Sequence, residues 1–352
     1  MIIYDGFLCY LDFHFRRMLR EYLKLARSFN AVLTGIAPVI GAIAMQQYDL
    51  LILIVLFFIG FFGHIFGFVF NDIIDYHIDK SSKDINDRPL VSGTISLRNA
   101  KAFAFGSMII AFVLSLYLAF STNRFFPLLI LVVSALLVII YDLVSKKFLF
   151  TDIFIALGVF FLILYGASNG ALPSLTVLAF IVCLLGAIQV LFMQIVTGGI
   201  KDIENDFKRG AKTLALHMGV RVSEGKLHTS PAYKALAYGI QLVDLSIVFL
   251  PFFIVWNVRR LSLFQYFQWV TLFLLGVLMF LLTYKLLTME GFDRMRARKY
   301  IGSHYLVNFS LVPIMLMTLE NPWPCLLIIF PVLGFVFSNI VLHGTLLQPK
   351  TM

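Results

Sequence analysis

Asn71-Asp72-Ile73-Ile74-Asp75-Tyr76-His77-Ile78-Asp79 is the stretch in which a long apolar run ends in three carboxylates. Continued as a helix, it places Asn71, Asp75 and Asp79 on one face, because these residues recur every four positions. Asp72 lies about one turn from Asp75 and about two turns from Asp79. Residues 71–79 form what we name the first acidic window, and their clustering predicts a functional site at the end of a helix.

A second acidic window, residues 202–206, follows another apolar run far downstream. Its two aspartates, Asp202 and Asp206, again stand four positions apart. Of the 19 acidic residues in the chain, five fall in 72–87 and three in 202–206. Carboxylates this close together repel one another unless a cation holds them, and the pattern therefore predicts a divalent metal.

The composition is that of a membrane protein. The chain has 352 residues, 60% of them apolar, and its mean hydropathy is +0.92. Apolar runs of roughly 20 residues recur, and each is long enough to cross about 30 Å of hydrocarbon. We therefore predict an all-α fold, a polytopic bundle of nine or ten transmembrane helices, the number being open because 301–318 carries several polar side chains. The predicted spans are 30–48, 51–72, 100–121, 125–142, 152–169, 173–199, 233–256, 264–288, 301–318 and 322–345.

The distribution of Lys and Arg predicts the orientation of the bundle. The net charge is +9, but the basic residues follow alternate loops and do not form one nucleic-acid-binding patch. With the N-terminus in the cytoplasm, the opposite loops hold only Arg124, Arg259 and Arg260. This positive-inside bias predicts a multi-pass protein of the cell membrane with both acidic windows facing the cytoplasm and no nucleic-acid partner.

The same patterns divide the chain into three parts. Residues 1–29 are predicted to include an amphipathic helix on the cytoplasmic leaflet, because apolar and basic residues alternate there with helical periodicity. Residues 30–345 form the transmembrane bundle, in which the polar loops 73–99 and 201–232 are cytoplasmic caps. Residues 346–352 are a C-terminal tail. Each acidic window is followed by a basic loop, which suggests two pseudo-symmetric halves whose acidic ends face each other.

Two carboxylate clusters surrounded by Lys and Arg predict a site for Mg²⁺ that carries a phosphorylated ligand. Magnesium is usually held by one or two carboxylates together with waters and substrate phosphate oxygens. Two Mg²⁺ ions would bracket a diphosphate, and nearby cations would stabilise the charge that builds as it departs. The 37 Phe and 14 Tyr of the chain offer an apolar, aromatic interior. An isoprenyl diphosphate satisfies both requirements, and its allylic cation would alkylate a lipophilic acceptor.

Several motifs resemble those of the UbiA-type intramembrane prenyltransferases. They are Asn71-Asp72-x-x-Asp75-x-x-x-Asp79, Asp202-x-x-x-Asp206, Arg88-Pro89-Leu90-x-Ser92-Gly93 and Lys212-Thr213-Leu214, and they follow the second and sixth spans. The resemblance covers roughly residues 20–290 and implies that Mg²⁺ bridges both windows to a prenyl diphosphate. It implies metal-facing roles for Asn71, Asp75, Asp79, Asp202 and Asp206. Arg88, Lys146 and Lys212 are the expected diphosphate contacts, and Asp72, Asp79, Arg88, Tyr141 and Lys146 the expected catalytic groups.

Alternatives to this interpretation remain open. A CDP-alcohol phosphotransferase also uses aspartates at the membrane surface, but the chain has no Asp-Gly-x-x-Ala-Arg run. A cation transporter would place its acids near the middle of the bilayer, and here they lie at helix ends.

The acceptor is also open: it is an aromatic quinone precursor, a porphyrin or, in archaea, the hydroxyl of geranylgeranylglyceryl phosphate. The Tyr141–Lys146 spacing and the entry to the first span, Arg27-Ser28-Phe29-Asn30, favour the ether-lipid branch.

Overall fold

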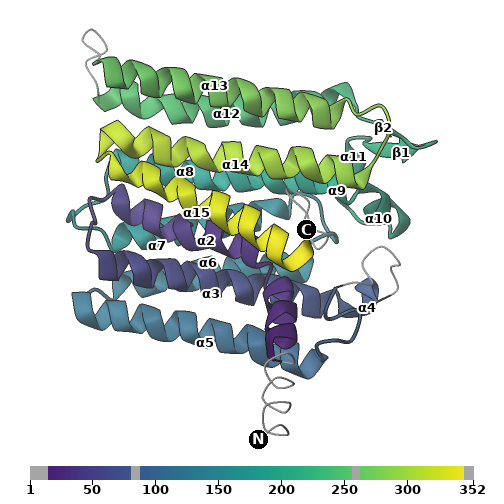
Figure 1. The fold of residues 1–352 in the computed structure, drawn as a ribbon, viewed down its shortest axis with the longest axis horizontal. Coiled ribbons are helices and arrows are strands. Elements are labelled where there is room, and N and C mark those ends of the chain that lie inside the picture. The colour runs from purple at the N-terminus through teal and green to yellow at the C-terminus, as the bar shows by residue number, and fades with distance from the viewer. Residues whose placement is uncertain (1–14, 81–87, 256–261, 345–352) are drawn as a thin grey trace, which may run out of the picture.

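The computed structural model describes residues 15–80, 88–255 and 262–344, and in these ranges the fold is a bundle of long helices (Figure 1). The helices lie side by side, with α12 and α13 at one edge and α5 at the other (Figure 1). The all-α prediction is therefore confirmed. The long helices are α2 (Ser28–Ile43), α3 (Leu50–Ile74), α5 (Leu97–Thr122), α6 (Phe126–Val144), α7 (Asp152–Ser168), α8 (Val177–Phe192), α12 (Pro231–Val255), α13 (Leu263–Leu287) and α14 (Arg294–Leu319).

Short elements connect these helices, and most of them gather at one end of the bundle (Figure 1). They are α4 (Tyr76–Asp79), the π-helix η2 (Met193–Gly198), α9 (Gly199–Lys201), α10 (Ile203–Lys208), α11 (Leu214–His217) and the antiparallel hairpin β1 (Arg221–Ser223) and β2 (Lys226–His228). The hairpin pairs Val222 with Leu227. The polar segments that follow the two acidic windows thus share one end of the molecule.

The predicted number of spans, nine or ten, is not confirmed. Among the described residues, seven helices are long and apolar enough to cross a membrane, and the bent pair Phe15–Leu25 and Asn30–Ile43 would make an eighth. Helix α7 is apolar but has only 17 residues. The segment 301–318 lies within α14, which is one of the seven. Large apolar side chains stay exposed on the outer helices, such as Phe267 on α13 at 63%, as a lipid-facing surface requires.

The last predicted span, 322–345, is not one α-helix. Its described part consists of η3 (Trp323–Ile328), α15 (Ile329–Val332), η4 (Leu333–Phe337) and η5 (Asn339–His343), which are 3₁₀, α, π and π segments. Pro322, Pro324 and Pro331 lack the amide hydrogen that a continuous α-helix needs, so the regular hydrogen-bond ladder is interrupted there. The tail 346–352 lies outside the described residues.

The N-terminal segment is helical from Phe15 to Leu25 and is bent by 59° from the following helix. Its inner face packs on the bundle: Leu25 is buried against α3 and α5, and Tyr22 meets Phe103 edge-on with ring centroids 5.0 Å apart. Phe15 and Leu19 remain exposed. An amphipathic helix is therefore present in the described part of 1–29, while its place on a leaflet stays a prediction.

Local sequence signals account for the helix ends. Asp49 accepts hydrogen bonds from the first amides of α3, and Thr176 does the same at α8. Ser262 and Gln265 form a reciprocal capping box at the start of α13. Such side chains satisfy amide groups that have no partner inside the helix.

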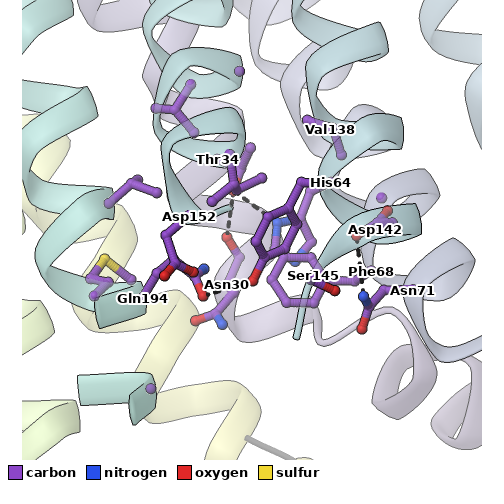
Figure 2. A pocket seen from close by; sticks show the side chains of 18 of the residues that line it. Asn30, Thr34, His64, Phe68, Asn71, Val138, Asp142, Ser145, Asp152 and Gln194 are labelled. Carbon is purple, nitrogen blue, oxygen red and sulfur yellow. Dashed lines mark hydrogen bonds between the residues drawn. The ribbon is translucent and has the colours of Figure 1, made fainter. Parts of the chain in front are cut away.

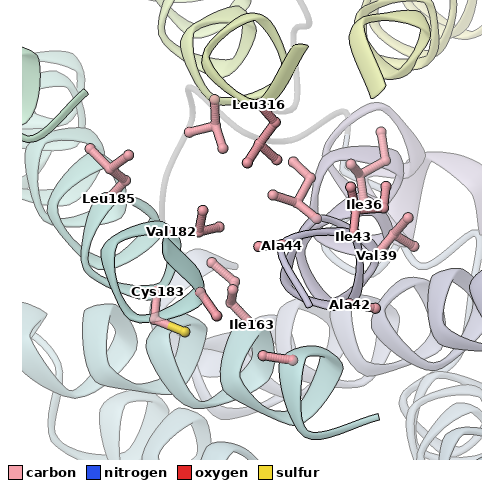
Figure 3. Close-up of a cluster of buried hydrophobic side chains, with 14 of the residues drawn as sticks. Ile36, Val39, Ala42, Ile43, Ala44, Ile163, Val182, Cys183, Leu185 and Leu316 are labelled. Atoms are coloured by element: carbon pink, nitrogen blue, oxygen red, sulfur yellow. The ribbon is translucent and has the colours of Figure 1, made fainter. Parts of the chain in front are cut away.

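The core of the bundle lies where α2, α7, α8 and α14 meet. Figure 3 shows Ile36 and Ile43 of α2 facing Ile163 of α7, Val182 and Leu185 of α8, and Leu316 of α14. Glycines let α2 and α7 approach closely. A Cβ on Gly166 would lie 1.8 Å from the backbone oxygen of Pro38, and one on Gly41 would lie 2.1 Å from that of Ile163. Small residues allow this kind of backbone contact between membrane helices.

We expect Gly166→Ala to destabilise the bundle, because the added methyl group meets backbone that cannot move aside. Overpacking of this kind costs about 1–3 kcal/mol. The matched control is Gly239→Ala in α12, where a Cβ meets nothing within 4 Å. Thermal unfolding in detergent should show a lower midpoint for Gly166→Ala and an unchanged or slightly higher midpoint for Gly239→Ala. Equal midpoints for the two variants would show that α2 and α7 do not pack so closely.

Candidate active site

Both acidic windows line one cavity of about 640 Å³ at the capped end of the bundle. Asp75 and Asp79 of the first window and Asp202 and Asp206 of the second all border it. Among the described residues, six aspartates and seven Lys or Arg side chains line this cavity. The predicted meeting of two windows remote in sequence is therefore present in the fold.

The first acidic window keeps its helical spacing although its helix is broken. Helix α3 ends at Ile74 with Asp75 as its C-cap, and α4 resumes one residue later. The amide of Asp75 still donates to the carbonyl oxygen of Asn71, and the amide of Asp79 to that of Asp75. The Asn71 side chain reaches into the cavity and donates from Nδ2 to Oδ1 of Asp142 over 3.2 Å (Figure 2).

Arginines hold the outer carboxylates of this window. Arg27 Nη2 lies 2.8 Å from Asp72 Oδ1, and Arg88 Nη1 lies 2.7 Å from Asp79 Oδ2 and 3.7 Å from Asp72 Oδ1. Burial lowers the pKa of Arg88, but Asp72 and Asp79 outweigh it and raise that pKa above its usual value. Asp72 is buried and is not among the residues that border the cavity. It therefore holds two arginines in place from behind the cavity wall.

The second acidic window begins directly after the π-helix η2 and the single turn α9. Gly199 allows α9 to approach α11 and α12, since a Cβ there would lie 2.8 Å from Ala215 Cβ and 3.2 Å from the Tyr233 hydroxyl. Asp202 is the N-cap residue that precedes α10, and Asp206 lies one turn further, its amide donating to the carbonyl oxygen of Asp202. The π-helical turn falls immediately before the acidic residues, where such distortions are frequently functional.

The two aspartates of this window have different environments. Burial raises the pKa of Asp202, but the Lys201 and Arg294 cations outweigh burial and hold it well below its usual range. Asp206 is 3% exposed, and burial raises its pKa to about 6 while Lys146, 4.0 Å away, opposes the rise. Asp202 is thus a fully charged carboxylate, whereas Asp206 takes up a proton more readily and becomes neutral as the pH falls through about 6.

Contacts between distant parts of the chain join the two windows directly. Arg209, just after α10, places Nη1 3.3 Å from Asp79 Oδ1 of the first window. The amide of Lys212 donates to the carbonyl oxygen of Lys146 over 2.8 Å. Lys146 itself adopts a positive φ of 65°. The predicted diphosphate contacts Arg88, Lys146 and Lys212 therefore come from three separate loops and all border the cavity.

Tyr141 also borders the cavity, but its hydroxyl has a partner of its own. It donates to Gln194 Oε1 of η2 over 3.2 Å. Figure 2 shows Gln194 together with Asn30, Asp152 and Ser145 in the polar part of the cavity. His64, a buried neighbour, bonds Thr34 Oγ1 through Nδ1 at 2.8 Å (Figure 2). Tyr141 lies in the last turn of α6 and not in the loop that follows it, and its role toward a diphosphate stays a prediction.

Away from the charged groups the cavity is apolar. Its walls continue between the helices along side chains of α2, α5, α6, α7 and α8, among them Leu33, Phe112, Leu131, Leu162 and Val182. The cavity therefore combines a charged mouth with a hydrocarbon-compatible interior. A ligand with a diphosphate head and a long apolar chain matches both ends.

Four cations of the site are not among the predicted site residues. Arg27, Lys201, Arg209 and Arg294 all border the cavity and pair with aspartates of the two windows. Lys201 could have been found from its place beside Asp202, and Arg27 from its place at the start of the first span. Arg209 and Arg294 carry no local signal, because their partners Asp79 and Asp202 lie 130 and 92 positions away.

The donor set fits a metal that arrives with a phosphorylated ligand. Nowhere in the described part of the chain do three His, Cys, Asp or Glu side chains gather closely enough to hold a metal. Asp75 borders the cavity and, within the described ranges, takes part in no ion pair. Mg²⁺ needs only one or two carboxylates when phosphate oxygens and waters complete its shell. Asp75 together with Asp206 or Asp202 meets that requirement.

Comparison with known proteins agrees with this geometry. A family model described as "UbiA prenyltransferase family" matches residues 31–288. A digeranylgeranylglyceryl phosphate synthase of Methanocaldococcus jannaschii is 38% identical over 106 residues, which are 30% of this chain and 37% of that protein. The protein of the same name from Saccharolobus solfataricus is 28% identical over 255 residues, 69% of this chain and 87% of that protein. The structure of a UbiA homologue from Archaeoglobus fulgidus bound to GPP and Mg²⁺ aligns with a TM-score of 0.61 at 13% identity, covering 84% of this chain and 98% of that one. The last comparison shows a common fold.

We expect Arg209→Gln to loosen the contact between the two windows, because it leaves Asp79, itself 5% exposed, with Arg88 as its remaining ion-pair partner among the described residues. Loss of a charged hydrogen bond of this kind costs about 1–3 kcal/mol. Lys208→Gln is the control, since Lys208 is the exposed neighbour and the change in charge is the same. The thermal midpoint in detergent should fall for Arg209→Gln only. A similar fall in both variants would point to net charge and not to the ion pair.

Proposed function

Because the chain belongs to the UbiA prenyltransferase family, we propose that it transfers a prenyl group from an isoprenyl diphosphate to the hydroxyl of a glyceryl phosphate lipid, with Mg²⁺ as cofactor. The observation that carries this proposal is the single cavity in which both acidic windows and the loop cations surround an apolar interior. Two related chains carry the name digeranylgeranylglyceryl phosphate synthase, and this name supports the glyceryl phosphate lipid over an aromatic acceptor. The family match favours prenyl transfer over a CDP-alcohol phosphotransferase or a cation transporter.

The reaction breaks the bond between C1 of the prenyl chain and the diphosphate oxygen. The leaving diphosphate keeps the bonding electron pair, C1 forms a bond to the acceptor oxygen, and the acceptor hydroxyl gives its proton to the departing diphosphate or to water. Bound Mg²⁺, proposed as two ions, would neutralise charge on the diphosphate and weaken its bond to C1. Asn71, Asp75, Asp79, Asp202 and Asp206 are the residues proposed to hold it, with the ion pairs of Asp79 and Asp202 giving way when the ligand binds.

The cations of the site would bind the diphosphate and stabilise it as it leaves. Arg88, Lys146 and Lys212 reach the cavity from three loops, so they can surround a diphosphate on several sides. Their charges are already in place before the reaction, which makes such stabilisation effective. Asp72 and Asp79 orient Arg88 through its two ion pairs. Asp72 is therefore proposed to act through the arginines that it positions.

The apolar half of the cavity would hold the prenyl chain and keep water away from the allylic cation. Phe112 and Phe68 border this space, and an aromatic face stabilises a nearby cation by roughly 0.5–2 kcal/mol. Phe68 already carries the Arg27 guanidinium 4.8 Å above its ring. The positive-inside bias supports a charged mouth on the cytoplasmic side, where water-soluble diphosphate would leave.

We expect Asp75→Asn and Asp202→Asn each to lower the transfer rate at least 100-fold, because each removes a carboxylate proposed to hold Mg²⁺. Transfer is measured with labelled geranylgeranyl diphosphate and a panel of acceptors. Glu204→Gln is the control: Glu204 lies between Asp202 and Asp206 but is exposed and does not border the cavity. Gel filtration of all three variants in detergent checks that they remain folded. Near-normal transfer by Asp75→Asn would contradict the metal assignment.

The acceptor panel tests the rest of the proposal. Geranylgeranylglyceryl phosphate should give a product with a new ether bond, stable to mild alkali, and the aromatic acids hydroxybenzoate and naphthoate should give none. EDTA should abolish the product and added Mg²⁺ should restore it. A prenylated aromatic product in place of the ether would assign the chain to another branch of the family.

A further inference from the structure

Asp202 has both carboxylate oxygens engaged by cations. Arg294 Nη2 lies 2.6 Å from Oδ1, and Lys201 Nζ lies 3.4 Å from Oδ2. A carboxylate in this state already has a cation at each oxygen, and these two positive charges repel a divalent ion. If Asp202 is a metal ligand, one of these cations has to leave when the metal binds.

Arg294 is the cation whose position allows it to leave. It is the first residue of α14, beyond the residues 31–288 that the family model matches, whereas Lys201 is the sequence neighbour of Asp202. The preceding Asp293 caps α14 by accepting from the Met295 amide, so the helix start is held without the Arg294 side chain. Arg294 itself borders the cavity, and its Nε is buried with no hydrogen-bond partner among the described residues.

The guanidinium group suits a second partner inside the cavity. It offers five donors in a planar fork that matches the oxygens of a phosphate group, and it keeps its charge at any physiological pH. Within the described ion pairs, the Arg294 side chain uses one nitrogen toward Asp202. A diphosphate that enters the cavity could therefore take over the group without a change in protonation.

We propose that Arg294 exchanges partners during the reaction: it holds Asp202 while the cavity is empty and passes to the diphosphate when Asp202 turns to the metal. This inference rests on the proposed function. It makes Mg²⁺ and diphosphate bind cooperatively, because diphosphate draws away the cation that opposes the metal at Asp202, and such coupling is reciprocal. The Asp202 carboxylate, whose side chain is 30% exposed, keeps a positive partner throughout, so its charge stays compensated. Arg294 thereby becomes a substrate-binding residue supplied by the C-terminal helix.

The test measures two affinities of the purified protein in detergent, neither of which requires turnover. The first is the affinity for Mn²⁺ alone, used in place of Mg²⁺ and followed by the loss of the free-ion EPR signal. The second is the affinity for geranylgeranyl thiolodiphosphate, an unreactive analogue, at saturating Mg²⁺. Arg294→Gln should bind Mn²⁺ alone more tightly and the analogue more weakly, each by roughly tenfold, within the 5–150-fold range of typical couplings.

Two further variants separate this exchange from a structural role. Arg296→Gln makes the same change in charge on the exposed face of the same turn and should alter neither affinity. Arg294→Lys keeps the charge but loses the fork, so it should leave Mn²⁺ affinity near that of the wild type and weaken the analogue. Unchanged or weaker Mn²⁺ binding by Arg294→Gln would overturn the inference. Equal effects of Arg296→Gln on the two affinities would also overturn it. In both cases the wild-type protein would still transfer the prenyl group, so the proposed function would be unaffected. A wild-type protein that binds neither metal nor analogue would instead refute the proposed function.

Discussion

The need of buried carboxylates for positive charge organises this structure. Asp72, Asp79, Asp202 and Asp206 are largely removed from water, and each lies within 4.0 Å of a Lys or Arg nitrogen. An unpaired charge in such a place is expensive. The cations come from different loops and helices, so satisfying the aspartates also ties those elements together. The ion pair between Arg209 and Asp79, 3.3 Å apart, joins the segment after the second acidic window to the first window.

The same pairing prepares the cavity for an anion and a metal. With its aspartates already matched by cations, the site is close to neutral before any ligand enters. A divalent ion that binds alone gains little binding free energy there, because the aspartates already have positive partners. A diphosphate that binds alone would have to compete with the aspartates for the arginines. When the metal and the diphosphate bind together, the metal supplies positive charge to the aspartates and the diphosphate supplies negative charge to the arginines. This balance explains why the described residues show no preformed three-carboxylate metal cluster, although two acidic windows face one cavity.

Packing and charge act on different ends of the same helices. Close contact between α2 and α7 depends on glycines such as Gly41 and Gly166. This contact is part of the apolar core of the bundle. The helix ends near the cavity are less regular: α3 breaks at Asp75 and α8 passes into the π-helix η2. The first window keeps its spacing of four across the break, whereas the π-helix η2 departs from the α-helical period, and its Gln194 borders the cavity.

Much of the fold and part of the site could be predicted from the sequence, because these features depend on the order of residues close together in the chain. Helix periodicity and hydropathy predicted most of the helical segments and the all-α fold, and the spacing of four predicted which aspartates share a face. The backbone bonds from Asn71 to Asp75 and from Asp75 to Asp79 keep that spacing across the break in α3. The span count was not confirmed, since α7 is short and the prolines after Asn321 interrupt the last apolar run.

Hydrophobicity and helical spacing are properties of neighbouring residues, so the order of the amino acids is enough to predict a helical membrane bundle with two acidic clusters. Which cation meets which carboxylate depends instead on how the helices pack. Arg209 and Arg294 reach Asp79 and Asp202 across 130 and 92 positions, and no local pattern marks either arginine. Charges attract without regard to sequence distance, so their pairing is set by the helices that bring them together.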